Sequence, residues 1–178
     1  LAMTEYSASA PLFGAARASG GRLRVASMPG VSRRMEETAL AADYRRVAQR
    51  AELLAGLLDG AVTAEVLFPG GERMFFDLRH RRPHADRGLC RSGSPEPLIN
   101  LPGGEAYIVP YEGERTGDPS RTFGRIPVAE GADGARLVVA RNRIEQVEGD
   151  GALADRYRAL FERDAARRNV AELGLGCN

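Results

Sequence analysis

The chain has 178 residues, of which 43% are hydrophobic and 28% charged, a composition typical of one compact soluble domain or two small ones. Basic and acidic residues nearly cancel, and the formal net charge of +1 argues against a dedicated nucleic-acid-binding protein or a binder of anionic membranes. The two cysteines, Cys90 and Cys177, fit neither a disulfide framework nor a zinc-binding spacing, so we expect a reducing, cytoplasmic location.

The terminal stretches bear on targeting and on completeness. No stretch is apolar for long enough to span a bilayer, and "LAMTEYSASAPLFGAARASG" lacks the charged and apolar regions of a signal peptide. Both ends are abrupt, because Leu1 and Ala2 precede Met3 and the chain stops at Asn178 directly after an apolar, glycine-rich stretch. We therefore expect a fragment of a soluble protein.

The first third of the chain predicts a short strand and one long helix. The segment "SAPLFGAARAS" is typical of the end of a helix, and "RLRVASMPG" of a strand over 23–28 that Pro29 and Gly30 end. Ser32 is the expected N-cap of a helix over 33–58, and Gly60 the residue that closes it. Its apolar stripe recurs at steps of three and four: Leu40, Tyr44, Val47, Ala51, Leu54 and Leu58.

From residue 62 the apolar residues alternate, which predicts strands. A β-hairpin is expected over 62–78, around the turn "PGGE". Residues 79–99, "RHRRPHADRGLCRSGSPEPLI", show no period, so a long irregular loop is expected there. The segments "EAYIVP", "TFGRIPV", "ARLVVA" and "NRIEQVEG" then predict four more strands.

The last part of the chain predicts a second amphipathic helix from Asp150 or Gly151, and "NVAELGLG" a short buried strand. The inward stripe of this helix is Leu153, Tyr157, Leu160 and Phe161. The order of elements favours a mixed α/β or α+β fold, with a β-rich middle section and two main amphipathic helices. We divide it into residues 1–60, the end of an N-terminal α/β region, and residues 61–178, a β-rich region.

Several polar groups have a structural explanation. His80 and His84 are four residues apart, but Pro83 disfavours a helix between them, so both are expected to be solvated loop residues. The arginines from Arg79 to Arg91 suit a substrate carboxylate or phosphate, or a polar loop. Cys90 lacks a recognisable catalytic signature, and the glycines of "PGG" are explained by the hairpin turn.

Two glutamates stand within apolar runs. Glu105 begins "EAYIV" and Glu172 interrupts "VAELGL", and a buried carboxylate needs an ion-pair partner, hydrogen bonds or a metal. One alternative pairs each with an arginine: Arg91, Arg125 or Arg168. The other makes both glutamates ligands of a divalent cation, with the "PGG" before Glu105 forming a tight turn. The residue types alone leave both alternatives open.

The sequence segments around these two glutamates resemble segments of a known protein family. "NLPGGEAYIVPYEGE" over 100–114 resembles the Asn-Leu-Pro-x-Gly-Glu-Val-Tyr/Phe-x-x-Pro segment of the thermophilic-type metalloaminopeptidases, peptidase family M29. "NVAELGLGCN" over 169–178 resembles that family's Glu-Leu-Gly-Ile-Gly-x-Asn segment, and "RVASMPGVSRRM" with "DYRRVAQRAELLAGLL" resembles a stretch upstream. The resemblance implies a fragment of a larger two-domain metallopeptidase-like fold, truncated within the metal-site region.

The resemblance implies that Glu105 and Glu172 are metal ligands in a two-metal site, with Zn, Co or Mn as the cofactor. Such an ion pair polarises the scissile carbonyl and activates water, and the reaction is removal of N-terminal residues from peptides. Asn100, Gly103 and Gly104 are expected to shape the turn, and Tyr107 or Tyr111 to line the pocket. No other catalytic residue is assigned, and homodimerisation is implied by the family.

The sequence also departs from the family. Its remaining ligands, histidines and the aspartate of a His-x-Asp motif, follow the second glutamate in family members, and this sequence ends at Asn178 before any of them. Because transition-metal sites use three or four protein ligands, we expect the 178 residues to be inactive alone. Two alternatives remain: a related non-haem iron dioxygenase that cleaves dihydroxypyridine rings, and an inactive homologue that acts as a binding or assembly subunit.

Overall fold

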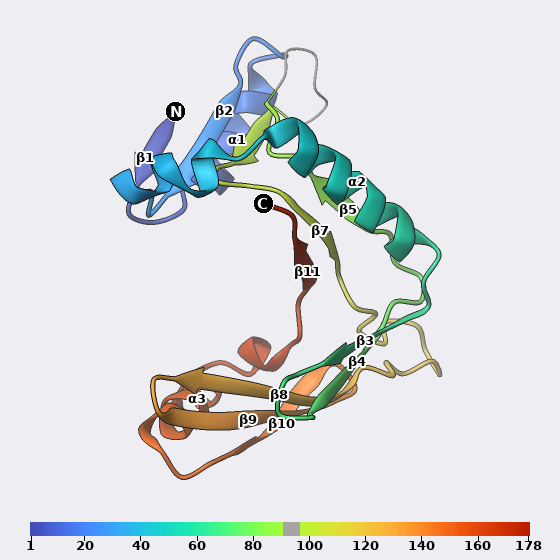
Figure 1. The fold of residues 1–178 in the computed structure, drawn as a ribbon. Coiled ribbons are helices and arrows are strands. Elements are labelled where there is room, and N and C mark those ends of the chain that lie inside the picture. Colours follow the sequence, from blue (N-terminus) through green and yellow to red (C-terminus); the bar gives the residue numbers. More distant parts are fainter. Residues whose placement is uncertain (91–96) are drawn as a thin grey trace. The chain divides into compact units, whose positions relative to one another are not determined.

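A computed structural model describes residues 1–90 and 97–178, and it confirms the mixed α/β class. The chain forms two compact units, coloured along the sequence in Figure 1. Unit 1 consists of Leu1–Leu57, Pro83–Tyr107 and Gly174–Asn178, and unit 2 consists of Leu58–Arg82 and Ile108–Leu173. Each unit is built from separate stretches of chain, and the division into 1–60 and 61–178 stays a prediction.

Unit 1 contains a parallel sheet with the order β1-β2-β6. Its strands are β1 (Ala2–Thr4), β2 (Val25–Pro29) and β6 (Leu98–Asn100), and helix α1 (Ser9–Ala18) contacts β2 and β6. Four consecutive residues of β2, from Val25 to Met28, are buried, as expected for a central parallel strand covered on both faces. The helix and the strand predicted from the N-terminal sequence are therefore confirmed.

The predicted start of the long helix is wrong. Residues Arg33–Glu37 and Ala39–Ala41 form short 3₁₀ segments, and α2 begins only at Tyr44 and ends at Asp59. Thr38 interrupts any continuous helix, because its φ of −122° and ψ of −104° lie outside the helical region. The N-cap is Asp43, whose Oδ1 accepts a hydrogen bond from Arg45 N–H at 3.0 Å, whereas Ser32 makes no side-chain cap.

A second small sheet of unit 1 has the order β11-β7-β5, with β5 (His84–Asp86), β7 (Glu105–Ile108) and β11 (Leu173–Gly176). Helix α2 packs Val47 and Ala51 against Cys177, with Ala85 of β5 beside them. The expected loop over 79–99 is thus partly wrong, because it contains β5 and the start of β6. These strands are three residues long and pair with distant segments, so no local period marks them. In β11, Leu173 is buried, while the two glycines are exposed.

Unit 2 is a five-stranded antiparallel sheet with the order β10-β9-β8-β4-β3, which confirms the hairpin and three later strands. The strands are β3 (Thr63–Leu67), β4 (Arg73–Asp77), β8 (Phe123–Glu130), β9 (Asp133–Ala140) and β10 (Arg143–Glu148). Helix α3 (Ala152–Arg163) contacts β9 and β10 and buries Leu153 and Phe161 of the predicted stripe, followed by a 3₁₀ turn, Ala165–Arg168. Among the described residues, no helix has the length and apolar character to cross a membrane.

Candidate functional site at the NLPGGE turn

The segment over 100–105 is a tight connection between β6 and β7, and its Leu101–Pro102 peptide bond is cis. A Cβ atom on Gly103 would lie 2.5 Å from the carbonyl oxygen of Asn100 and 2.8 Å from Oδ2 of Asp86. Gly104 has a φ of +118°, and a Cβ atom there would lie 2.2 Å from Cγ1 of Val47. Both positions therefore require glycine, because any side chain would collide with the neighbouring strand or with α2.

The turn borders a hollow of about 280 Å³ that lies entirely within unit 1. Its lining combines two carboxylates, two carboxamides and small residues of the turn: Asp86, Asn100, Pro102, Gly103, Gly104, Glu105, Gly176 and Asn178. Carboxylate and amide oxygens are hard ligands that suit divalent cations such as Mn²⁺, and they also bind ammonium groups. The hollow is therefore a polar site with acidic character.

Asp86 is a carboxylate of this hollow that the sequence did not predict as a site residue. It lies directly opposite Glu105 in the antiparallel pairing of β5 and β7, so the two side chains stand on the same face of the sheet. Its Oδ1 accepts from Gly88 N–H at 2.8 Å, and its Oδ2 from Gly104 N–H at 3.4 Å. An aspartate two residues before a glycine, in "HADRG", is the local signal for the first of these bonds.

The two predicted metal ligands have different surroundings. Glu105 is half-buried on β7 in unit 1, whereas Glu172 is exposed and belongs to unit 2, directly before β11. The expectation that Glu172 is buried and needs a partner is therefore wrong, because a solvated carboxylate has no desolvation cost to offset. Within the described part of unit 2, no ion pair joins Glu172 to Arg125 or Arg168.

The arginines that were considered as partners are engaged elsewhere or lie outside the described residues. Arg125 is 3.8 Å from a carboxylate oxygen of Glu148, and Arg168 donates to the carbonyl of Ile144 at 2.8 Å. Arg91 falls in the part of the chain that the structure does not describe. For Glu105, the choice between an arginine and a metal stays a prediction.

The remaining predicted site residues are divided between the two units. Asn100 is exposed, and its Oδ1 accepts from the Ser9 hydroxyl at 2.8 Å. The half-buried ring of Tyr107 stacks on His84, with 5.2 Å between ring centroids. Tyr111 is buried in unit 2, where its hydroxyl donates to the carbonyl of Asp118 at 2.9 Å. The structure thus brings Asn100, Gly103, Gly104 and Glu105 to one hollow, and it packs Tyr111 elsewhere.

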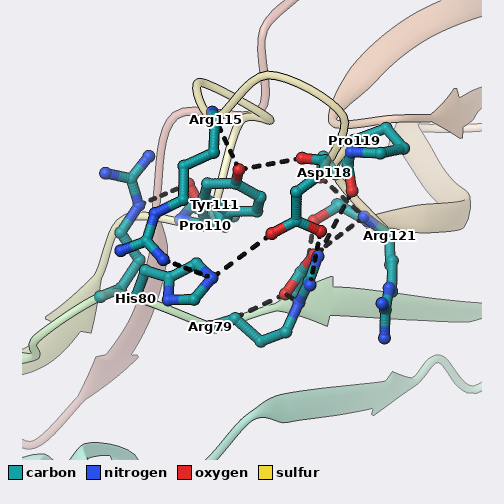
Figure 2. Close-up of polar contacts among 12 residues, drawn as sticks. Arg79, His80, Pro110, Tyr111, Arg115, Asp118, Pro119 and Arg121 are labelled. Carbon is teal, nitrogen blue, oxygen red and sulfur yellow. Dashed lines mark hydrogen bonds and ion pairs between the residues drawn. The ribbon is translucent and has the colours of Figure 1, made fainter.

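Unit 2 contains a separate network of charged residues around Arg79 (Figure 2). The buried carboxylate of Asp77 accepts from Arg79 Nε at 2.9 Å, from Arg79 Nη2 at 2.7 Å and from Arg121 N–H at 2.9 Å. Burial alone raises the pKa of Asp77, but these donors outweigh it, so its pKa is held below the ordinary value. Arg79 also donates to Asp118 at 2.8 Å and lowers the pKa of that carboxyl group.

The two histidines lie in different units, and three arginines of residues 79–90 form ion pairs within the chain. His80 belongs to unit 2, where its Nε2 lies 3.4 Å from Asp118, whereas His84 belongs to unit 1. Both are exposed, as expected, although His84 lies on β5 rather than in a loop. Arg79, Arg81 and Arg87 form ion pairs with Asp77, Glu114 and Glu52, respectively. Their charges are therefore largely matched by carboxylates of the same chain.

The fit of a metal to the described residues is incomplete. Over residues 1–90 and 97–178, no group of three or more His, Cys, Asp or Glu side chains is arranged to hold a metal ion. A transition-metal site needs three or four protein ligands. The hollow provides hard oxygen donors in Asp86 and Glu105, and these two carboxylates alone fall short of that number.

Comparisons with known proteins relate the fold to two enzymes, and only at a distance. No protein-family model and no curated protein matches the chain. The structure of 2,5-dihydroxypyridine dioxygenase from Pseudomonas putida KT2440 is similar, with a TM-score of 0.65 and 16% identity over 85% of this chain and 44% of that one. AmpT from Thermus thermophilus, an M29 aminopeptidase, is similar with a TM-score of 0.54 and 16% identity, over 76% of this chain and 34% of AmpT.

These similarities establish a shared fold and a distant structural relation to both enzymes. The chain spans less than half the length of either one. At this level of identity the comparison favours neither activity.

Proposed function

We propose that this chain is part of a divalent-metal-dependent, aminopeptidase-like hydrolase that removes N-terminal residues from peptides. The observation that carries the proposal is the hollow at the NLPGGE turn, where two obligatory glycines place Glu105 among oxygen-donor side chains. The resemblance of residues 100–114 and 169–178 to M29 aminopeptidases, and the fold shared with AmpT, support the same assignment.

In this proposal Glu105 and Glu172 each bind a divalent cation, Zn²⁺, Co²⁺ or Mn²⁺, and the complete site contains two ions. Further protein ligands are required, and the family resemblance places them downstream of the second glutamate. A divalent cation held by such a complete set of ligands would supply Lewis-acid chemistry, polarising a peptide carbonyl and lowering the pKa of a water molecule. The contribution of this chain is to hold the Glu105 carboxylate at the hollow, with Asn100, Gly103 and Gly104 shaping the wall.

The proposal is tested on the protein produced from its complete coding sequence. With Mn²⁺, Co²⁺ or Zn²⁺ added, we expect release of the chromophore from an aminoacyl-anilide substrate. Glu105→Gln and Glu172→Gln should each abolish release while the circular dichroism spectrum stays unchanged. Glu145→Gln, at an exposed position on β10, is the matched control and should keep full activity. Full activity in both site variants would refute the assignment of these ligands.

A second candidate function is ring cleavage of an aromatic diol by a non-haem iron dioxygenase. The fold shared with the 2,5-dihydroxypyridine dioxygenase, at a TM-score of 0.65 over 85% of this chain, is the observation behind this candidate. An oxygen electrode distinguishes the two candidates. Oxygen consumption with Fe²⁺ and a dihydroxypyridine, without release from the anilide substrate, would support the dioxygenase and contradict the peptidase.

The partners and location in this proposal are a peptide or small-molecule substrate, a second copy of the chain in a homodimer, and the cytoplasm. Sedimentation velocity of the complete protein tests the dimer. If that protein binds no Mn²⁺, Co²⁺, Zn²⁺ or Fe²⁺, both enzymatic candidates fail, and a binding or assembly subunit becomes the better assignment.

A further inference from the structure

The peptide groups that precede Glu105 are held by three hydrogen bonds within unit 1. The carbonyl of Gly103 accepts from Asn178 Nδ2 at 3.0 Å, and the carbonyl of Gly104 accepts from Cys177 N–H at 2.9 Å. On the other side, Gly104 N–H donates to Asp86 Oδ2 at 3.4 Å. The turn is therefore hydrogen-bonded on one side to Cys177 and Asn178, which follow β11, and on the other side to Asp86, the last residue of β5.

Asp86 is itself fixed by the chain that follows it. Its Oδ1 accepts from Gly88 N–H at 2.8 Å, which leaves Oδ2 directed at the turn. Gly88 has a φ of +60°, and a Cβ atom there would lie 2.4 Å from the ring of Tyr44. Helix α2 thus lies against this segment through Tyr44 and against the turn through Val47.

The position of Asp86 links this support to the carboxylate of the proposed site. Asp86 and Glu105 are directly opposite residues on neighbouring strands, and both line the hollow. Gly103 has no side chain, and an added Cβ would come within 2.8 Å of Asp86 Oδ2, so the carboxylate packs directly on the turn. A movement of Asp86 would therefore shift the backbone from which Glu105 projects.

We propose that Asp86 is a positioning residue that holds Glu105 in the geometry required to bind a divalent cation. This inference rests on the proposed function, because it assumes that Glu105 is a ligand. The physical reason is that the two oxygens of one carboxylate accept from two different peptide N–H groups, and so tie the end of β5 to the start of β7. Residues that orient a ligand change metal affinity without touching the metal.

The test measures Mn²⁺ affinity of the complete protein by calorimetric titration, without a turnover assay. Asp86→Ala should weaken Mn²⁺ binding by about 10–100-fold, the range for residues that orient ligands. Asp86→Asn keeps one acceptor oxygen and should cause a smaller loss. It also provides a near-isosteric variant if Asp86→Ala fails to fold. In the absence of metal, hydrogen exchange at the Gly104 amide should be faster in Asp86→Ala.

The matched control is Asp164→Ala. Asp164 makes the same kind of bond to the peptide N–H two residues ahead, at 2.9 Å, but it caps the 3₁₀ turn Ala165–Arg168 in unit 2 and is not among the residues that line the hollow. It should lower stability while leaving the Mn²⁺ affinity and the exchange of Gly104 unchanged. A general effect of destabilisation on metal binding would appear in this control.

The outcomes separate the two proposals. If Glu105→Gln leaves Mn²⁺ binding intact, the proposed function fails and the positioning role fails with it. If Glu105→Gln abolishes binding while Asp86→Ala behaves like Asp164→Ala, only the positioning role is overturned. If Asp86→Ala removes binding as completely as Glu105→Gln, Asp86 is a ligand, and its role as a positioning residue is likewise refuted.

Discussion

Single residues in this chain are constrained by what surrounds their backbone as much as by their own chemistry. Glu105 and Glu172 have the same side chain, yet one is half-buried on a strand and the other is exposed before one. Gly104 and Gly176 both line the hollow, but only Gly104 has a positive φ and a neighbour where a Cβ atom would lie. These differences give predictions that residue type alone does not.

Gly104→Ala should destabilise the protein by about 2–4 kcal/mol, because the left-handed φ and the collision with Val47 both oppose a methyl group. Gly176→Ala is the matched control, since no atom lies within 4 Å of its added Cβ, and it should change stability by less than about 0.5 kcal/mol. Urea denaturation of both variants measures the difference. Equal stabilities would show that the turn relaxes freely.

Because the pKa of Asp77 is lowered in the folded protein, we expect the stability of unit 2 to depend on pH. Its folded pKa is lowered, so the stabilisation is present above its unfolded pKa of about 3.9 and is lost as the pH falls through the folded pKa. Asp77→Asn should cost about 1.5–3 kcal/mol at pH 7, because Arg79 loses a charged acceptor. The loss of stability on acidification below about pH 4 should also become shallower in the variant.

Thermal unfolding from pH 7 to pH 3 measures both effects. Glu130→Gln is the control, because Glu130 pairs with Arg156 at the surface and should contribute little. A profile for Asp77→Asn that is parallel to the wild-type profile would contradict the assignment.

At the scale of elements, local patterns identified long segments correctly and placed some ends incorrectly. The apolar stripe from Leu40 to Leu58 is helical only from Tyr44. Thr38 has non-helical backbone angles, and Asp43 provides the N-cap of α2. The strands β5 and β6 were expected to be loop, since three residues carry no detectable alternation. Their structure depends on pairing with β7 and β2, which are formed by distant segments.

The helix boundary gives a direct test. Asp43→Ala should destabilise the protein by about 1 kcal/mol through loss of the N-cap of α2. Ser32→Ala should have no measurable effect, because Ser32 makes no capping hydrogen bond. Urea denaturation midpoints compare the two. A larger loss of stability in Ser32→Ala than in Asp43→Ala would instead support a helix that starts at residue 33, as the sequence predicted.

At the scale of the whole molecule, the chain passes between its two units four times. Unit 1 needs three separate segments, and its core joins Val47 and Ala51 of α2 to Cys177 near the C-terminal end. In unit 2, α3 packs against β9 and β10 of the five-stranded sheet and forms the core with them. We expect each unit to respond as a cooperative block to damage in its own core.

Ala51→Asp places a charge in the fully buried core of unit 1 and should cost about 3–5 kcal/mol there. Hydrogen exchange should accelerate in all three segments of unit 1, including β7 and Cys177, while β8 and β9 keep their protection. Val139→Asp, at a buried position of β9, is the reciprocal variant and should affect unit 2 only. Acceleration throughout the chain in both variants would mean that the units unfold together.

The sequence by itself determined the elements that depend on neighbours along the chain. The alternation of Val66 and Phe68 and of Met74 and Phe76 predicted the hairpin, and the spacing of Leu153 and Phe161 predicted α3. The sequence segment over 100–105 also predicted the turn before Glu105 and the role of its glycines. In these cases the physical cause is local, because periodicity, turn chemistry and backbone strain act over a few residues.

Only the tertiary structure decided which distant residues meet. Asp86 stands opposite Glu105 because β5 pairs with β7 in one register, and a shift of one residue would turn Asp86 to the other face. The burial of Asp77, which accepts a hydrogen bond from Arg121 N–H, and the exposure of Glu172 likewise depend on packing between segments far apart in the chain. Register and burial are set by contacts across the fold, and no pattern within one segment contains them.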